Sequence, residues 1–347
     1  MKFSHQFSRM SSIILILSFN FSQGCDQQTS AQDSSFKQNL IYLPLDGEVA
    51  NRYSEISGLT WYKDQLILLP QYPGRFAMDN VSSLFKISKQ EIINYLENPN
   101  EDIRLIPGRI EFDEQGIPEE LTGFQGYESV VIIENKMYLT IECKQDGVMK
   151  AYLVEGIITG NAENIALNKE SLKVLPMPIE IKNYSYESMI FVGRRLDICY
   201  EANGLNIFKN PMMIEVNLMN SEINLKPFLN LEYRITDATD IDTNGCFWVI
   251  NYYWPGDYDL LEPAPDPLEA QSRIAGTFSQ DDAIERLVEL KYSPNGMELS
   301  NTAPIVIGST SSGSSRNWEG ITRLDHLGFL LATDKHPRTI LAFLPLD

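Results

Sequence analysis

The chain has 347 residues, of which 43% are apolar, and a formal net charge of −19. This length and apolar content are sufficient for one large domain with a well-buried core. A strongly acidic chain lacks the basic surface that a phosphate polymer requires, which argues against nucleic acid as a partner.

The first 24 residues have the pattern of a targeting segment rather than of a folded element. Lys2 and Arg9 flank the apolar run 13–21, which is too short to span a bilayer of ~30 Å. Ser22, Gln23, Gly24 and Cys25 follow this run. The segment resembles a bacterial lipoprotein signal, in which Cys25 would accept the lipid.

This resemblance predicts a signal peptide over residues 1–24, a flexible tether over 25–38 and a lipid-anchored protein of the bacterial cell envelope. The segment departs from the usual pattern at Ser22 and Gln23, where Leu and a small residue are expected. The alternative is cleavage after Ala31, which would remove the lipid-accepting cysteine and leave a secreted or periplasmic protein.

A short phrase recurs five times along the rest of the chain. Nearly every copy opens with an acidic residue, and it continues with an apolar strand, a polar turn, a second apolar strand and a closing polar residue. The copies begin 50 to 82 residues apart, which suits one four-stranded sheet per repeat. The copies open at Ser57 (with Glu55 two residues before it), Glu128, Glu187, Asp237 and Glu319, and they close at Gln71, Glu142, Glu201, Asn251 and Asp334.

The repeats predict an all-β fold, a single β-propeller domain of five blades over residues 39–347. Six blades are the alternative, because the interval between the last two copies could hold two. Residues 90–96 are expected to form at most a short helix. Further strands are expected at 83–88, 103–112, 151–157, 212–218 and 287–292.

The two ends of the domain are expected to pair. After its first two strands the last copy has only residues 339–346 left and lacks a fourth strand. Residues 39–45 precede the first copy and have no blade of their own. Pairing of these two segments would close the last sheet and leave no open strand edge at that point.

The segment 252–280 is rich in proline, carboxylates and aromatic residues. This composition predicts a long surface loop, which in a folded domain is either functional or disordered.

Three cysteines follow Cys25 in the chain, namely Cys143, Cys199 and Cys246. Their odd number excludes complete pairing among themselves. They are expected to be buried and reduced, with a Cys143–Cys199 bridge as the alternative, and their spacing does not match a zinc site.

The acidic residues of the repeats predict a cation site. The innermost strand of a propeller blade runs along the central channel, so the opening and closing residues should form two rings near one mouth. Such crowded carboxylates repel one another unless a cation lies between them, and oxygen ligands of this kind suit Ca²⁺. The alternative is that the opening residues bind backbone amides between blades. The expected Ca²⁺ ligands are Ser57, Glu128, Glu187, Asp237 and Glu319.

Two further groups of residues near this mouth are candidates for chemistry. Carboxylates of the closing ring could activate water, and the candidates are Glu142, Glu201 and Asp334. Basic side chains on nearby loops could bind a phosphate or carboxylate, or could merely neutralise neighbouring acids. These candidate substrate-binding residues are Arg75, Lys335, His336 and Arg338.

Three segments, at residues 57–71, 126–142 and 319–334, resemble the phytase-like esterase propellers. The order of the opening residues is also similar to that of the soluble calcium-activated nucleotidases. The resemblance implies a five-bladed propeller that holds Ca²⁺ in its channel. The chain departs from these families at Asp237, where the nucleotidases have Ser, and at Asn251 and Tyr252, where Glu-Arg is usual.

Three functions are consistent with these patterns. The first is a Ca²⁺-dependent hydrolase of a phosphoester, in which the metal polarises the phosphoryl group. The second is a non-catalytic binding propeller with structural Ca²⁺, and the third is an esterase or lactonase. The expected partners are a small anionic molecule or phosphoester and, through the lipid, a membrane. The sequence indicates neither the substrate nor the oligomeric state.

Overall fold

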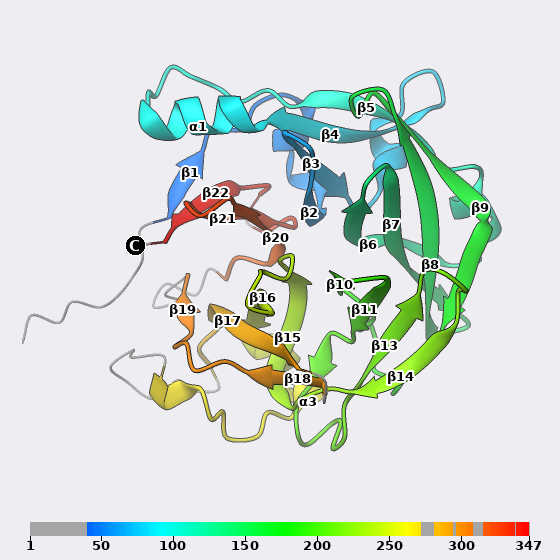
Figure 1. Ribbon diagram of the computed structural model, residues 1–347, viewed down its shortest axis with the longest axis vertical. Helices are drawn as coiled ribbons and strands as arrows, with labels where there is room; N and C mark the ends of the chain where they lie inside the picture. The colour runs from blue at the N-terminus through cyan, green and yellow to red at the C-terminus, as the bar shows by residue number, and fades with distance from the viewer. Residues whose placement is uncertain (1–39, 272–280, 294–295, 308–314, 337, 347) are drawn as a thin grey trace, which may run out of the picture. The chain divides into compact units, whose positions relative to one another are not determined.

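Antiparallel strands dominate the computed structural model, and they form a β-propeller whose sheets surround a common axis (Figure 1). The predicted signal peptide (1–24) and tether (25–38) lie outside the residues that the structure describes. Those residues are 40–271, 281–293, 296–307, 315–336 and 338–346.

The strand pairing groups most described strands into five antiparallel units, each beginning with a strand close to the axis (Figure 1). The first unit contains β2 (Ile56–Tyr62), β3 (Gln65–Pro70), β4 (Ser82–Ser88) and β5 (Gly108–Asp113). The second contains β6 (Phe124–Ile133), β7 (Lys136–Gln145), β8 (Val148–Thr159) and β9 (Asn164–Leu175). The third contains β10 (Ser188–Val192), β11 (Arg195–Cys199), β13 (Met212–Asn217) and β14 (Ile223–Pro227).

The fourth unit holds all described strands of the long interval before the last repeat. It contains β15 (Leu231–Ala238), β16 (Cys246–Tyr253), β17 (Ile284–Ser293) and β18 (Gly296–Leu299). The short strands β12 (Ala202–Asn203) and β19 (Ile305–Val306) join the same sheet. The fifth contains β20 (Trp318–Leu324), β21 (Gly328–Thr333), β22 (Leu341–Pro345) and β1 (Ile41–Leu43). This grouping agrees with five blades, although the blade count stays a prediction.

Pairing of the two ends of the domain closes the last sheet, as predicted. β1 runs antiparallel to β22, with Ile41 opposite Phe343 and Leu43 opposite Leu341. A second junction was not predicted: β5 and β9 pair in parallel, so the first and second units share one eight-stranded sheet. Both junctions cover outer strand edges that would otherwise be unpaired.

Most of the further predicted strands are present, with one difference of position. The strand expected at 103–112 begins only at Gly108. Pro107 has no amide hydrogen for a ladder bond and restricts the residue before it, which ends regular pairing there. Leu105 instead makes an isolated bridge with Leu45.

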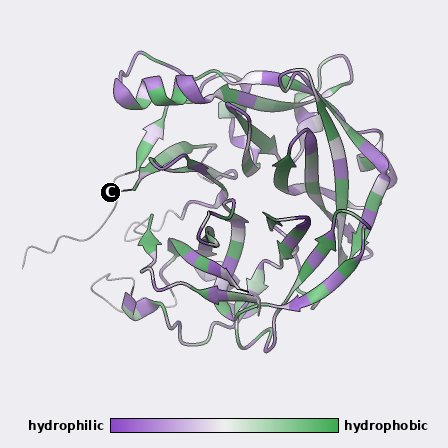
Figure 2. Ribbon diagram, viewed as in Figure 1, coloured by the Kyte–Doolittle hydropathy of each residue, from purple (hydrophilic) through white to green (hydrophobic). Residues whose placement is uncertain are grey.

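The core consists of apolar clusters that lie within and between neighbouring sheets. Outer strands alternate in hydropathy, as β9 does with one face buried and the other exposed (Figure 2). Cys143 and Cys199 are buried and Cys246 is partly buried, and all three are free thiols, so the alternative disulfide does not form.

Helices are short and lie outside the sheets. The predicted helix at 90–96 is α1 (Lys89–Glu97), which Ser88 and Glu91 cap at its start through reciprocal hydrogen bonds. None of the described helices is long and apolar enough to cross a membrane. The others are α2 (Ile117–Glu120), α3 (Tyr258–Leu261), η1 (Glu48–Ala50), η2 (Arg52–Ser54), η3 (Pro73–Phe76), η4 (Pro255–Asp257) and η5 (Glu269–Gln271).

The first two residues of the predicted loop at 252–280 belong to β16, and the rest of its described part, which ends at Gln271, contains the short helices η4, α3 and η5. A buried ion pair holds it against the fourth unit, since Arg286 on β17 donates to Asp266 at 2.6 Å. Residues 272–280 lie outside the described residues. The described part is therefore a fixed wall beside the propeller mouth rather than a free loop.

Candidate functional site

The opening residues of the repeated phrase stand where the first strand of a unit begins with an irregularity in its pairing. This irregularity determines where their acidic side chains point. The pairing of β2 with β3, β6 with β7 and β20 with β21 shifts register at the opening residue, so that Ser57, Glu128 and Glu319 have no partner directly opposite. A bulge of this kind re-aims the side chain of the extra residue. Glu187 directly precedes β10 and occupies the equivalent place in the third unit.

Hydroxyl groups of neighbouring units fix the backbone at these places. In three cases a Ser or Thr hydroxyl donates to the carbonyl of the residue just before an opening glutamate. These bonds link one unit to the next and hold each glutamate at a set depth. They run from Ser57 to Tyr127 (2.6 Å), from Thr140 to Tyr186 (2.9 Å) and from Thr236 to Trp318 (2.7 Å).

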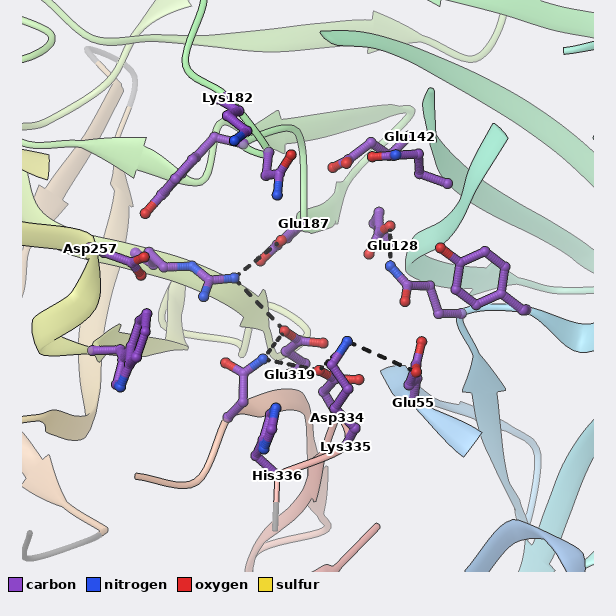
Figure 3. A pocket seen from close by; sticks show the side chains of 18 of the residues that line it. Glu55, Glu128, Glu142, Lys182, Glu187, Asp257, Glu319, Asp334, Lys335 and His336 are labelled. Atoms are coloured by element: carbon purple, nitrogen blue, oxygen red, sulfur yellow. Dashed lines mark hydrogen bonds and ion pairs between the residues drawn. The ribbon is translucent and has the colours of Figure 1, made fainter. Parts of the chain in front are cut away.

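The opening glutamates converge on one cavity of about 640 Å³ (Figure 3). Seven carboxyl groups and four Lys or Arg side chains line it, together with amides and aromatic rings. The lining carboxyl groups belong to Glu55, Glu128, Glu142, Glu187, Asp257, Glu319 and Asp334. The lining cations belong to Arg75, Lys182, Arg234 and Lys335.

The five residues predicted as Ca²⁺ ligands separate into two groups. Glu128, Glu187 and Glu319 line the cavity, whereas Ser57 and Asp237 do not. Asp237 accepts from the backbone amide of Ile321 in the next unit at 2.7 Å, and Ser57 makes the inter-unit bond described above. Asp237 thus makes the backbone amide bond of the alternative interpretation, whereas Ser57 bonds to a backbone carbonyl.

The closing residues separate in the same way. Gln71, Glu142 and Asp334 line the cavity, and Gln71 donates to Glu128 at 2.8 Å. Glu201 lies outside the lining, fully buried against Arg234. Asn251 is also buried, where it donates to the carbonyl of Glu232 at 2.9 Å. Of the three carboxylates proposed to activate water, Glu142 and Asp334 therefore face the cavity.

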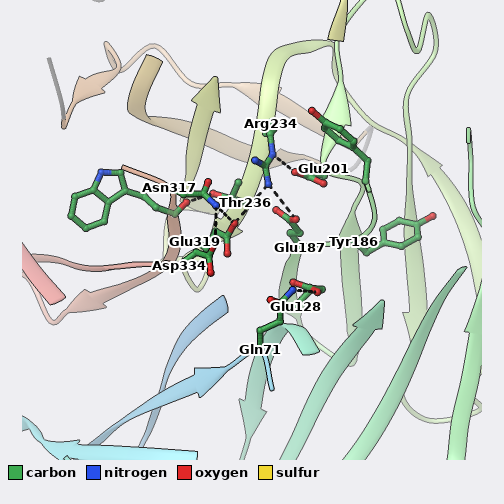
Figure 4. Close-up of polar contacts among 12 residues, drawn as sticks. Gln71, Glu128, Tyr186, Glu187, Glu201, Arg234, Thr236, Asn317, Glu319 and Asp334 are labelled. Atoms are coloured by element: carbon green, nitrogen blue, oxygen red, sulfur yellow. Dashed lines mark hydrogen bonds and ion pairs between the residues drawn. The ribbon is translucent and has the colours of Figure 1, made fainter. Parts of the chain in front are cut away.

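Arg234 lies at the centre of the acidic cluster, and sequence reasoning missed it (Figure 4). Its guanidinium bonds to Glu201 and lies 3.5 Å from Glu187 and 3.8 Å from Glu319. Burial lowers the pKa of Arg234, but the charges on these glutamates outweigh burial and raise it well above its usual value. A permanent cation therefore offsets part of the negative charge.

The position of Arg234 bears on the departure noted at Tyr252. Arg234 on β15 is the direct cross-strand partner of Tyr252 on β16, and its guanidinium lies over the Tyr252 ring, 5.4 Å from the centroid. Arg234 thus brings a guanidinium to the strand pair of β15 and β16. The segment 231–238 also contains Glu232 and Asp237, so no pattern in the sequence singles out Arg234.

Three other carboxyl groups of the cavity have pKa values above their usual range. Burial raises the pKa of Glu128 well above its usual range, and the charge on Glu142 raises it further. Burial, followed by the charge on Glu201, raises the pKa of Glu142 to about 8. Burial and the charge on Asp334 raise the pKa of Glu319 well above its usual range, although Arg234 opposes this. The cavity thus has more negative charge than its own cations offset.

Several buried oxygens of the cluster also lack hydrogen-bond donors. Glu187 Oε2, Glu201 Oε2 and Asp334 Oδ1 are buried without a donor. A shared proton or a bound cation would satisfy these oxygens, and carboxylate oxygen is the donor type that Ca²⁺ prefers.

The described side chains are not arranged as a finished metal site. Among the described residues, no group of three or more His, Cys, Asp or Glu side chains is close enough to hold a metal ion. The carboxylate oxygens of the cluster are of a type that suits Ca²⁺. To coordinate the ion, the carboxyl groups that lie away from Arg234 would have to move closer to it.

The predicted substrate-binding residues lie mostly at the mouth. Arg75, Lys335 and His336 line the cavity, whereas Arg338 does not. Arg75 pairs with Glu55 at 3.0 Å, and Lys335 lies 3.9 Å from both Glu55 and Asp334. Lys335 therefore forms long ion pairs with two carboxylates at the mouth.

The wall after β16 adds residues that sequence reasoning did not single out. Trp254, Asp257 and Leu260 line the cavity. In the sequence, only the aromatic cluster at the start of the predicted loop pointed to these residues. That cluster did not show whether they face the cavity or the solvent. This part of the loop is therefore a component of the site.

Comparison with protein-family models gives no match, and comparison with curated proteins gives none either. Similar solved structures include the apo soluble aldose sugar dehydrogenase of Escherichia coli, with 10% identity, coverage of 88% of this chain and 98% of that chain, and a TM-score of 0.43. The catalytic domain of a Coprinopsis cinerea α-L-arabinofuranosidase has 11% identity, coverage of 89% and 97%, and a TM-score of 0.46. The α-L-arabinanase of Cellvibrio cellulosa has 8% identity, coverage of 83% and 90%, and a TM-score of 0.42. Similarities at this level assign neither a family nor an activity to the chain, and the phytase-like resemblance stays a prediction.

Proposed function

We propose that this protein is an exported propeller of phytase-like type that binds Ca²⁺ in its central cavity and hydrolyses a phosphoester. One observation carries the proposal: glutamates from three units converge in a single cavity where buried carboxylate oxygens lack donors. Uncompensated carboxylates of this kind are costly in a folded protein unless a cation binds between them.

The residues that would hold Ca²⁺ are Glu128 and Glu319, with Glu142 and Asp334 beside them. Glu187 is partly satisfied by Arg234 and would contribute its unpartnered oxygen. When bound, Ca²⁺ would polarise a phosphoryl oxygen and offset the charge of the cluster.

The other side chains of the cavity suit the remaining parts of the reaction. Lys335 and Arg75 at the mouth can donate to the free phosphoryl oxygens and so orient the ester. Asp334 has an unpartnered oxygen in the cavity and can accept the proton of an attacking water molecule. Glu142 lies in the same cavity and, when protonated, can return a proton to the leaving alcohol.

Hydrolysis tests this proposal directly. The purified protein should hydrolyse p-nitrophenyl phosphate in the presence of Ca²⁺. When a chelator is added, the rate of hydrolysis should fall by at least about 10-fold. Glu128→Gln, which removes one ligand charge, should lower the rate by about 10-fold or more. The matched control is Glu298→Gln on β18, which is exposed and outside the cavity and should leave the rate unchanged.

The alternative functions give different outcomes in the same assay. Calcium binding without hydrolysis of any ester would favour the non-catalytic binding module. Hydrolysis of p-nitrophenyl acetate but not of the phosphate would favour the esterase or lactonase. Either result would contradict the phosphoester proposal.

We also propose that the protein is attached to the cell envelope through lipid on Cys25. The support is the short apolar run 13–21, shortly before Gly24 and Cys25. Expression in a bacterial host with radiolabelled palmitate should label the protein and place it in the membrane fraction. Cys25→Ala should abolish the label, and labelling that persists in this variant would contradict the proposal.

A further inference from the structure

Trp254 is the large exposed aromatic side chain of the cavity wall. It directly follows β16 and lines the cavity, yet 51% of it is exposed to solvent. A tryptophan that is half exposed at the mouth of a polar cavity costs free energy unless a ligand covers it.

The indole of Trp254 lies against the backbone of Gly256. A β-carbon added at Gly256 would come within 2.0, 2.2 and 2.5 Å of three ring atoms, which essentially no side chain tolerates. Glycine is thus required for the ring to occupy this position against the chain. The ring therefore packs closely on the backbone at Gly256 and still lines the cavity.

Hydrogen bonds and an ion pair hold the segment that carries Trp254, so the backbone at the base of the ring is fixed. Asp257 donates its amide to the Trp254 carbonyl at 2.9 Å, and Asn206 donates to the carbonyl of Glu262 at 2.8 Å. The buried pair of Arg286 and Asp266 holds the far end of the segment. An aromatic ring that is already fixed loses little conformational entropy when a ligand stacks on it.

The other rings of the cavity are already engaged by protein groups. Tyr72 lies under Arg75, with 4.1 Å between the guanidinium carbon and the ring centroid. Tyr184 is buried and lies under Arg234 at 5.7 Å. Leu260, 39% exposed, extends the apolar surface beside Trp254. This part of the mouth therefore suits a flat apolar group, whereas the centre of the cavity suits a charged one.

We propose that Trp254 is a stacking platform and that the alcohol part of the phosphoester substrate carries a planar aromatic ring. The inference rests on the proposed function for the phosphate half of the ligand, and it adds the chemical class of the other half. Stacking of an aromatic ligand on a protein ring contributes about 1–3 kcal/mol, or roughly 5- to 100-fold in affinity.

Binding of two non-hydrolysable probes tests the platform. Calorimetric titration in Ca²⁺ should give a dissociation constant for phenylphosphonate at least about 5-fold lower than that for methylphosphonate. Trp254→Ala should remove this difference while leaving methylphosphonate binding unchanged. Trp254→Phe should keep most of it, and Gly256→Val, which displaces the indole without removing it, should weaken phenylphosphonate binding alone.

The matched control is Tyr258→Ala, because Tyr258 is an exposed ring of the same segment that does not line the cavity. It should change neither constant, and the melting temperature of every variant should confirm that it is folded. Equal affinity of the wild-type protein for both phosphonates would overturn the inference while leaving the proposed function intact. So would an equal loss of both affinities in Trp254→Ala.

A neutral probe separates failure of the inference from failure of the proposed function. If neither phosphonate binds, the phosphoester proposal fails, and saturation-transfer NMR with phenol then decides the platform. Saturation of phenol that is lost in Trp254→Ala supports the platform by itself. Absence of saturation in the wild-type protein would overturn it.

Discussion

Replacement of Arg234 with Met is expected to lower the free energy of unfolding by about 3–5 kcal/mol, which is the usual cost of removing one partner from a buried ion pair. Met keeps the apolar stem and removes only the guanidinium. Glu187, Glu201 and Glu319 would then be left without their shared cation. Urea unfolding in the presence of chelator measures the loss.

Two further variants show whether the lost charge of Arg234 causes the predicted fall in the free energy of unfolding. Arg194→Met removes an exposed arginine in the turn between β10 and β11 and should change stability by no more than about 0.5 kcal/mol. Combining Arg234→Met with Glu201→Gln removes both partners of the closest pair, so the double variant should lose less than the sum of the single losses. Additive losses, or a loss below about 1 kcal/mol for Arg234→Met, would show that the cluster does not depend on this cation.

The fold was predictable because the repeat is local and periodic. Each hairpin of the repeats is encoded by two apolar runs around a polar turn, and the unpaired ends identified β1 and β22 as partners. The parallel contact between β5 and β9 was not predictable in this way. It joins outer strands about 50 residues apart, which have no shared motif, and it depends on how neighbouring sheets pack.

The sequence predicted residues of the candidate site only where the repeat directs the side chain into the cavity. Glu128, Glu187 and Glu319 reach the cavity because each stands at an irregular strand start. Ser57 and Asp237 hold equivalent places in the sequence, but their shorter side chains bond to the adjacent backbone instead. The periodic pattern identifies a position and does not show which polar partner the side chain will find there.

Arg234 and Trp254 lie outside the repeated phrase, and this is why sequence reasoning did not find them. Arg234 enters the cluster from the strand facing Tyr252, and Trp254 enters it from the segment after β16. Each is placed by contacts between parts of the chain that are distant in sequence. Residues that adapt a repeated scaffold to one ligand are commonly of this kind, because loops rather than repeats carry specificity.

Calcium is expected to change how the stability of the protein depends on pH. Burial raises the pKa of Glu142 from its usual value near 4.5 to about 8, and it raises those of Glu128 and Glu319 well above their usual range. Between about pH 5 and pH 8 the folded protein therefore holds protons that the unfolded chain has released. Stability in chelator should fall as the pH rises through this window, because the folded state binds more protons.

Bound Ca²⁺ should reverse this trend, because it favours the ionised carboxylates. At pH 8 and a hundredfold excess over its dissociation constant, it should stabilise the fold by ~2.7 kcal/mol. Thermal unfolding at pH 5, 6.5 and 8, with Ca²⁺ and with chelator, measures both effects. Glu142→Gln should flatten the pH dependence in chelator, since an amide has no proton to lose, whereas the exposed Glu298→Gln should leave it unchanged. Calorimetric titration of the chelator-stripped protein with Ca²⁺ could give no heat, and Ca²⁺ could leave the pH dependence of stability unchanged. In that case the carboxylates of the cavity form, with Arg234, a structural cluster between units. The non-catalytic propeller would then be the better description of the protein.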